Sequence, residues 1–320
     1  MDKKALLRQA QTAAKEASCP PGKLFLIQVA IALGASLLVT LMNFLLSRQV
    51  DTAQGLTGMQ TRAMLGTVQS GLSYVLMFAV PVWEIGAVYA AMQICRGQDA
   101  GVKSLLQGFR QFWQMLRLIL LEAVVYGVAA VACTYVGMII YISLPMADAL
   151  TPYITQMGTS AQIEALIADE AFMHTLLSAA GGLLVIVGIL LAAVCIYVSY
   201  TLRLMRYAAL DDWKLGACRA LKLSAKWTKG CKMELFKLDL HFWAYYTLRV
   251  FTVLLAFTPE FLHFAGIRLP MDAQLAFWLF YAAYVAGQLT LGAFLRPKLE
   301  LTFAGAYDTL AGKSEGTTEA

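Results

Sequence analysis

The stretch GACRALKLSAKWTKGCKMELFKLDLHFWAYY, residues 216–246, begins as a basic segment and ends as an apolar, aromatic one. Its first half holds four cations at steps of three, four and three residues: Arg219, Lys222, Lys226 and Lys229. That spacing places the four side chains on one face of a helix. The aromatic half continues into an apolar segment of the length that crosses a bilayer, about 20 residues. The stretch therefore predicts a basic helix at a membrane surface that leads directly into a membrane-spanning helix.

The composition of the whole chain indicates an integral membrane protein. Apolar residues make up 59% of its 320 residues and charged residues 14%, and the mean hydropathy is +0.65. Soluble domains contain about 45–50% apolar and about 25% charged residues. Six stretches are long and apolar enough to span a bilayer: roughly 24–46, 67–94, 117–143, 175–200, 237–258 and 272–295. The predicted fold is an all-α, polytopic membrane helix bundle of six transmembrane helices with additional interfacial amphipathic helices.

The distribution of cations predicts the topology of this bundle. Lys and Arg residues concentrate before the first span, in alternate loops and after the last span, where the first and last groups are Lys3, Lys4, Arg8, Lys15 and Lys23, and Arg296, Lys298 and Lys313. The opposite segments hold Arg48, Arg62 and Arg268, and the long segment 144–174 holds no cation. Because cytoplasmic loops are enriched in Lys and Arg, both termini are predicted to be cytoplasmic. We expect one transmembrane domain over residues 1–312 and a disordered cytoplasmic tail over residues 313–320. The net charge of +5 follows this pattern, so no nucleic-acid partner is predicted.

The basic face of the opening stretch is the first candidate site, and it consists of Arg219, Lys222, Lys226, Lys229 and Lys232. Cations near the inner leaflet attract anionic head groups, at about 1 kcal/mol each. Gly230 is expected to break the helix, so that the chain turns from lying on the membrane to crossing it. Two interpretations stay open. The helix either fixes topology and anchors the fold, or it docks a lipid head group or a membrane or cytoplasmic protein partner.

Two charged residues within predicted spans form the second candidate site. Glu84 lies twelve residues before Arg96, and Arg249 lies twelve residues after Lys237. At about 1.5 Å per helical residue, each lies roughly 18 Å from its cation at the inner face. We therefore expect a Glu84–Arg249 pair that faces the interior of the bundle. Since charges within a bilayer are costly, three interpretations stay open: a static structural pair, an Arg249 that faces an aqueous vestibule, or a polar site that binds an anionic substrate or relays protons.

Other features of the spans predict helix packing rather than chemistry. Gln288 is expected to hydrogen-bond a neighbouring helix. Small residues four positions apart predict close helix contacts, at Ala123/Gly127, Gly188/Ala192 and Ala283/Gly287. No P-loop, GxSxG, dinucleotide or HExxH motif occurs, and the three histidines form no cluster with carboxylates at ligand spacing. The sequence therefore predicts no enzymatic activity, no cofactor and no metal site.

The block from Ala220 to Trp243 resembles the signature of a bacterial membrane family, domain of unknown function 975. Members tend to read A-x-x-x-S-x-x-x-x-x-G-x-K-x-x-x-F-x-L-x-L-x-F in this region. The matching residues here are Ala220, Ser224, Gly230, Lys232, Phe236, Leu238, Leu240 and Phe242. Arg96-Gly97 with Phe109, and FAGAY at residues 303–307, also fit. A Pro-Gly element that such proteins often carry is missing, and the segment 144–174 is longer than usual.

What this resemblance implies is a six-helix integral membrane protein with no established activity. The chain is also distantly similar to the membrane domain attached to some glycerophosphodiester phosphodiesterases, although their catalytic part has no counterpart here. That similarity favours lipid-related roles by analogy. The leading interpretation is a non-enzymatic, multi-pass plasma-membrane protein that binds anionic inner-leaflet lipids or a membrane partner through its basic helices.

A small-solute transporter or permease-like subunit is the alternative interpretation. It is favoured by the Glu84/Arg249 centre and by a weak parallel repeat of span, basic inner helix and span, in which Asp99 and Asp212 open the inner helices. A membrane-embedded lipid-modifying enzyme is the least favoured interpretation.

Overall fold

The computed structural model describes residues 3–52, 56–144, 169–264 and 271–315. The described residues form helices joined by short turns, without any strand, so the predicted all-α class is confirmed. Parts of the predicted features lie outside the described residues: positions 145–168 of the long segment, Arg268, and positions 316–320 of the tail.

Five helices within the described ranges are long and apolar enough to cross a membrane, or six if one bent pair is a single span. The continuous candidates belong to α2 (Pro21–Thr52), α3 (Leu56–Cys95), α6 (Phe112–Ile142), α9 (Glu170–Leu202) and α14 (Ala273–Phe294). The bent pair is α12 (Lys232–His241) and α13 (Trp243–Phe264). Each of the six predicted stretches therefore overlaps one of these helices or the bent pair.

The fifth predicted span is not one straight helix. Its axis turns by 65° between α12 and α13. At the break the backbone N–H of Phe242 donates to the carbonyl of Asp239, three residues back, at 2.8 Å instead of continuing the four-residue pattern. The Tyr246 hydroxyl donates across the break to a carboxylate oxygen of Asp239 at 2.6 Å. The separation of roughly 18 Å between Lys237 and Arg249, which assumes one straight helix, therefore does not hold.

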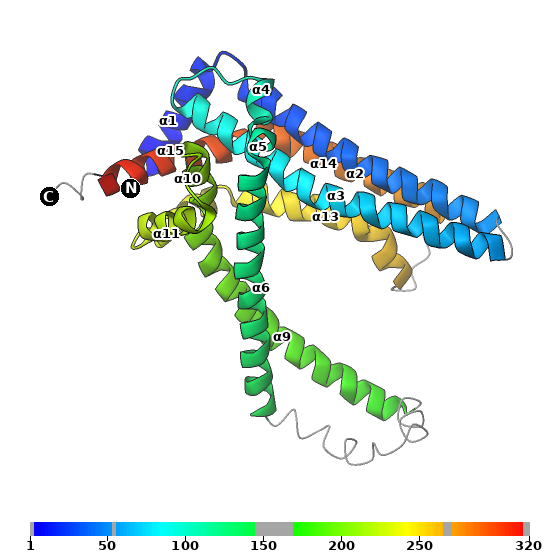
Figure 1. The fold of residues 1–320 in the computed structure, drawn as a ribbon. Coiled ribbons are helices and arrows are strands. Elements are labelled where there is room, and N and C mark those ends of the chain that lie inside the picture. Colours follow the sequence, from blue (N-terminus) through cyan, green and yellow to red (C-terminus); the bar gives the residue numbers. More distant parts are fainter. Residues whose placement is uncertain (1–2, 53–55, 145–168, 265–270, 316–320) are drawn as a thin grey trace. The chain divides into compact units, whose positions relative to one another are not determined.

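The chain divides into two compact units, residues 1–119 with 204–320, and residues 120–203. In the first unit α2 lies against α3 and α14, and α14 lies against α13 (Figure 1). Glycines make these contacts close. A Cβ on Gly287 would collide with the Thr252 side chain of α13, and a Cβ on Gly292 would lie 2.7 Å from Cγ2 of Val29 in α2. The close packing predicted at Ala283/Gly287 is therefore confirmed at Gly287, whereas Ala283 is exposed.

The second unit contains most of α6 together with α9. Within it a Cβ on Gly137 would lie 2.6 Å from Cγ2 of Val187, so these two helices approach closely at that point. The predicted close contacts at Gly127 and Gly188 are wrong for the part of the chain that the structure describes, because a Cβ on either glycine would meet no atom of another helix within 4 Å there.

A layer of helices joins the two ends of the chain in the first unit. It consists of α1 (Lys3–Glu16), α10 (Met205–Asp211), α11 (Ala217–Thr228) and α15 (Arg296–Glu315), and is called the terminal layer below. α15 is largely buried and contacts α1, α3 and α11. α1 rests on α15 (Figure 1), so the two terminal helices lie together. The side of the membrane on which this layer lies stays a prediction.

The loop between α3 and α6 packs along α3 and forms two short helices, α4 (Val102–Leu105) and α5 (Gln107–Arg110). A Cβ on Gly86 of α3 would collide with the Leu105 carbonyl, and a Cβ on Gly108 would collide with the Val82 carbonyl. The two backbones are therefore in direct contact. The predicted acidic starts of the inner helices are wrong, because the N-cap residues of α4 and α11 are Gly101 and Gly216.

Candidate functional site

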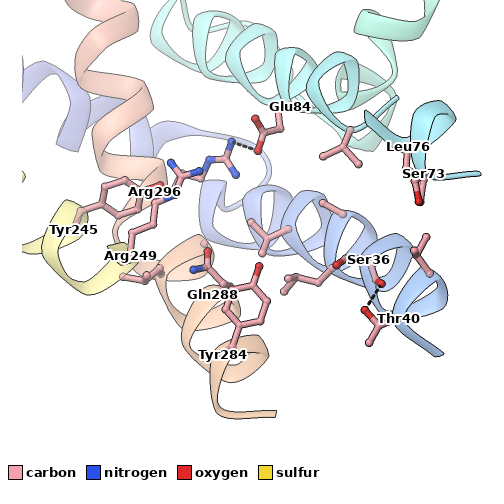
Figure 2. Close-up of a pocket in the computed structure, with 17 residues that line it drawn as sticks. Ser36, Thr40, Ser73, Leu76, Glu84, Tyr245, Arg249, Tyr284, Gln288 and Arg296 are labelled. Carbon is pink, nitrogen blue, oxygen red and sulfur yellow. Dashed lines mark hydrogen bonds and ion pairs between the residues drawn. The ribbon is translucent and has the colours of Figure 1, made fainter. Parts of the chain in front are cut away.

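A cavity of about 400 Å³ lies within the helix bundle of the first unit. Side chains from α2, α3, α13, α14 and the first residue of α15 line it. Figure 2 shows Glu84, Arg249 and Arg296 gathered at one end with Tyr245 and Gln288, whereas Ser36, Thr40 and Ser73 lie toward the other end. Both residues of the second candidate site thus face one cavity, although they come from different helices.

The ion-pair partner of Glu84 is Arg296. Nη2 of Arg296 lies 3.7 Å from Oε1 of Glu84, and Nε of Arg296 lies 4.0 Å from Oε1 of Glu300. The direct Glu84–Arg249 pair hypothesised from the sequence is therefore not the one that forms. Arg296 starts α15 just after α14 ends, and its side chain is 15% exposed and reaches back to α3. The sequence shows Arg296 as a flanking cation, and its place at a helix junction gives no signal of this contact.

Arg249 lines the same cavity without an ion pair to any described residue. The cavity lining thus carries two guanidinium groups and one carboxylate, which is a net formal charge of +1. In Figure 2 the Arg249 side chain extends from α13 toward Arg296. This arrangement leaves one cation with no acidic partner in the described part of the bundle.

Gln288 holds α13 and α14 together beside Arg249. Its Nε2 donates to Oγ1 of Thr252 at 2.7 Å, and the Thr252 hydroxyl donates to the Arg249 carbonyl at 2.9 Å. The prediction that Gln288 bonds a neighbouring helix is confirmed. These two hydrogen bonds fix the turn of α13 that carries Arg249.

Arg96 joins three elements at the terminal layer, a role that its sequence position did not indicate. Its Nη1 lies 2.6 Å from Oδ1 of Asp211 at the end of α10, and its Nη2 lies 2.6 Å from Oδ1 of Asp308 in α15. Hydrogen bonding to Asp308, and then to Asp211, raises the pKa of Arg96 above its ordinary value. The charged form of Arg96 is therefore part of the folded structure.

Tyr307 completes this cluster. Its hydroxyl donates to Oδ2 of Asp211 at 2.8 Å, and its ring stacks on Tyr207 and meets the edge of Trp227 of α11, with centroids 5.7 and 5.5 Å away. Burial raises the pKa of Tyr307 far above its ordinary value, and the hydrogen bond to Asp211 raises the pKa further. The hydroxyl thus stays protonated as a donor. Tyr207 in turn donates to Oε2 of Glu300 at 3.2 Å.

The basic face of α11 is exposed while the opposite face is fixed. Ala220, Ser224 and Thr228 have no exposed surface and pack into the terminal layer. Four of the predicted cations are exposed and the fifth is half-buried: Arg219, Lys222, Lys226 and Lys229, then Lys232. Arg219, Lys222 and Lys226 lie on α11, whereas Lys229 is its C-cap residue with an extended backbone and Lys232 is the first residue of α12. The predicted helical face is therefore confirmed for three of the cations, and the role of the basic segment stays a prediction.

Several family-signature residues of this block lie at buried positions or at a turn. Ala220 and Ser224 are buried contacts of α11, and Leu238 is fully buried in α12. Gly230 has φ +83°, a conformation that glycine adopts without strain, so it makes the turn between α11 and α12. Phe236 is 39% exposed. Ala220, Ser224, Gly230 and Leu238 therefore help to specify how α11 is seated and how the chain turns into α12.

The described residues contain no group of three or more His, Cys, Asp or Glu that could hold a metal ion. The expectations of no enzyme, cofactor or metal stay predictions.

Comparison with known proteins bears on the family. No curated protein and no solved structure matches the chain. The similarity to the membrane domain of glycerophosphodiester phosphodiesterases stays an interpretation of the sequence. The model of a family described as "Protein of unknown function (DUF975)" matches residues 22–285, a range that contains the whole signature block. Because this match covers most of the length of the chain, the chain belongs to the DUF975 family, domain of unknown function 975.

Proposed function

We propose that this chain is a non-enzymatic plasma-membrane protein that binds anionic phospholipid head groups of the cytoplasmic leaflet through the basic face of α11. The observation that carries the proposal is that three exposed cations of α11, with exposed Lys229 at its C-cap, lie opposite the fully buried Ala220, Ser224 and Thr228. Because the backbone of the helix is already held in place, binding to a charged surface has to order only the side chains of its cations.

The surroundings of α11 fit a membrane interface. Trp213 just before it and Trp243 at the start of α13 are 63% and 62% exposed. Exposed Trp side chains suit the head-group region, where one part of the ring is apolar and the other is hydrated. Four cations at about 1 kcal/mol each correspond to about 4 kcal/mol if they act independently. Such an attraction weakens with salt, because exposed charges are screened beyond about 10 Å at 0.1 M.

The test is native mass spectrometry of the full chain in an uncharged maltoside detergent with equal amounts of phosphatidylglycerol and phosphatidylethanolamine. The wild type is expected to retain phosphatidylglycerol preferentially. The triple variant Lys222→Glu, Lys226→Glu and Lys229→Glu should lose this preference, by about 100-fold if the three cations contribute about 1 kcal/mol each.

The matched control reverses three exposed cations on other helices: Arg8→Glu in α1, Lys103→Glu in α4 and Arg110→Glu in α5. Both triples change the net charge by the same amount. An equal loss of the phosphatidylglycerol preference in both triple variants would show a general charge effect and refute a site on α11. The wild type could instead show no lipid preference and retain a stoichiometric protein partner that only the α11 triple variant loses. That result would make the ligand of the basic face an acidic protein surface and would refute lipid binding.

The cavity favours a second candidate function, that of a small-solute transporter or permease-like subunit. A transporter must open its cavity to the two sides of the membrane in turn. Ser36→Cys and Ser73→Cys, both in the cavity lining, should then react with a membrane-impermeant maleimide added on either side, above the background of the parent chain. Labelling from one side only would contradict transport. The lipid-modifying enzyme stays the least favoured alternative.

A further inference from the structure

The charges at one end of the cavity are unequally balanced. Arg296 faces two carboxylates, Glu84 at 3.7 Å and Glu300 at 4.0 Å. Arg249 is exposed and has no ion pair to a described residue, although it lies on α13, part of the bent candidate span. A guanidinium within a membrane-spanning segment is costly unless a counter-charge or water reaches it. An anion in the cavity would supply that counter-charge.

The cavity lining mixes apolar and polar side chains. The apolar ones come mostly from α2 and α3, among them Val29, Leu33, Val39, Leu76 and Val80. Figure 2 shows Tyr245 and Gln288 at the same end as Arg249, so the charges of the lining are concentrated there, whereas the other end carries only the neutral hydroxyls of Ser36, Thr40 and Ser73. A ligand with an anionic group at the Arg249 end and an apolar body along the aliphatic side chains of α2 and α3 matches this distribution of charge.

The volume of about 400 Å³ limits the size of the ligand. It lies within the range of ligand pockets, about 300–1,000 Å³. At about 30 Å³ for each water-sized group, it holds on the order of a dozen non-hydrogen atoms. A medium-chain carboxylate has this size, whereas a complete phospholipid could insert only part of one chain.

We propose that this cavity is a binding site for an anionic amphiphile, in which Arg249 pairs with a single carboxylate or phosphate group and the apolar body lies along α2 and α3. Arg296 stays paired with Glu84 and Glu300 and holds the end of the cavity in shape. The site is separate from the basic face of α11, because it is lined by none of the α11 cations.

The experiment uses the purified full chain in an uncharged maltoside detergent and four probes. Decanoate carries both the charge and the apolar body, decanol carries the body alone, and acetate and inorganic phosphate carry the charge alone. Binding is measured by calorimetric titration and by the shift in the thermal unfolding midpoint. Decanoate is expected to bind and to raise the midpoint, and the other three probes are expected to have little effect.

Variants locate the bound anion. Arg249→Gln should weaken decanoate binding by about 10- to 100-fold, since it removes a charge-assisted hydrogen bond. Arg249→Lys keeps the charge and should restore part of the affinity. Ala32→Leu, which fills the cavity from α2 without touching its charges, should also weaken binding. The control Arg110→Gln removes an exposed guanidinium outside the cavity and should leave the affinity unchanged.

Several results would overturn the proposal. Equal binding of decanoate and decanol would show partition without recognition of charge. Equal decanoate affinity in the wild type and in Arg249→Gln would place the anion elsewhere. Loss of decanoate binding in the α11 triple variant, with binding kept in Arg249→Gln, would assign the anion to α11. Phosphate binding as strong as decanoate, and lost in Arg249→Gln, would support the anion site and overturn the apolar subsite, making the ligand a free oxyanion.

Discussion

Replacing Arg96 by Gln should destabilise the terminal layer, because one guanidinium holds two carboxylates from different helices. Arg96 lies 2.6 Å from Asp211 and 2.6 Å from Asp308. Charge-assisted hydrogen bonds contribute about 1.5–3 kcal/mol when buried. The three side chains are 32%, 38% and 29% exposed, so water screens them and we expect about 1 kcal/mol for each contact. The variant also leaves two carboxylates without their shared cation, which brings the expected loss to about 2–3 kcal/mol.

The assay is the unfolding free energy in mixed micelles titrated with dodecyl sulfate and followed by tryptophan fluorescence. Arg96→Gln, Asp308→Asn and the double variant form a cycle, whose coupling energy should be about 1 kcal/mol, so that the double variant loses less than the sum of the two. Arg110→Gln removes an exposed Arg and is expected to change the free energy by no more than about 0.5 kcal/mol. If the cycle is additive within about 0.3 kcal/mol, or if Arg110→Gln costs as much as Arg96→Gln, the assignment of Arg96 as the joint is refuted.

Three further changes test other contacts by the same assay. The pKa of Tyr307 is raised in the folded state. The stability that this shift contributes is therefore complete below the pKa of the unfolded chain, about 10, and is lost as the pH rises above 10. Tyr307→Phe should flatten the fall in stability above pH 10, and an unchanged pH profile would contradict this. Gly230→Ala places a side chain at φ +83° and should cost about 1–2 kcal/mol, so a neutral result would show that α11 ends differently. Gly86→Ala should cost about 1–3 kcal/mol, because its Cβ meets the backbone of α4. Gly127→Ala, whose Cβ would meet no described atom of another helix within 4 Å, should be neutral or stabilising by up to about 1 kcal/mol. Equal effects of the two variants would contradict the contact between α3 and α4.

The membrane helices were predictable because the apolar content of a span is a local property of the sequence. The same is true of the basic face of α11, which follows from residue spacing along one helix. The bend at Phe242 was not predictable, since residues 237–258 are apolar enough to span a bilayer and no Gly or Pro near Phe242 marks a break. The choice of Arg296 over Arg249 as the partner of Glu84 depends on where α15 starts relative to α3, which no spacing rule contains.

The burial of α15 could not be predicted for a related reason. Its charges are spread around the helix, so its sequence shows no apolar face, yet Phe303 and Tyr307 are almost completely buried. The charges are accommodated by pairing. Arg296 meets Glu84 and Glu300, and Asp308 meets Arg96, a partner more than 200 residues away in the chain. A helix whose polar groups are satisfied by tertiary contacts can be buried without an amphipathic pattern.

α15 contributes Arg296 to the cavity and also contacts α11. Near its start Arg296 lines the cavity, and one turn later Glu300 accepts a hydrogen bond from Tyr207. Tyr207 stacks on Tyr307, whose ring meets Trp227 of α11. Contact therefore runs without interruption from the basic helix to the cavity. Any movement of α15 that accompanies lipid binding at α11 would change the affinity of the cavity for an anion, and linkage requires that the anion change the lipid affinity by the same factor.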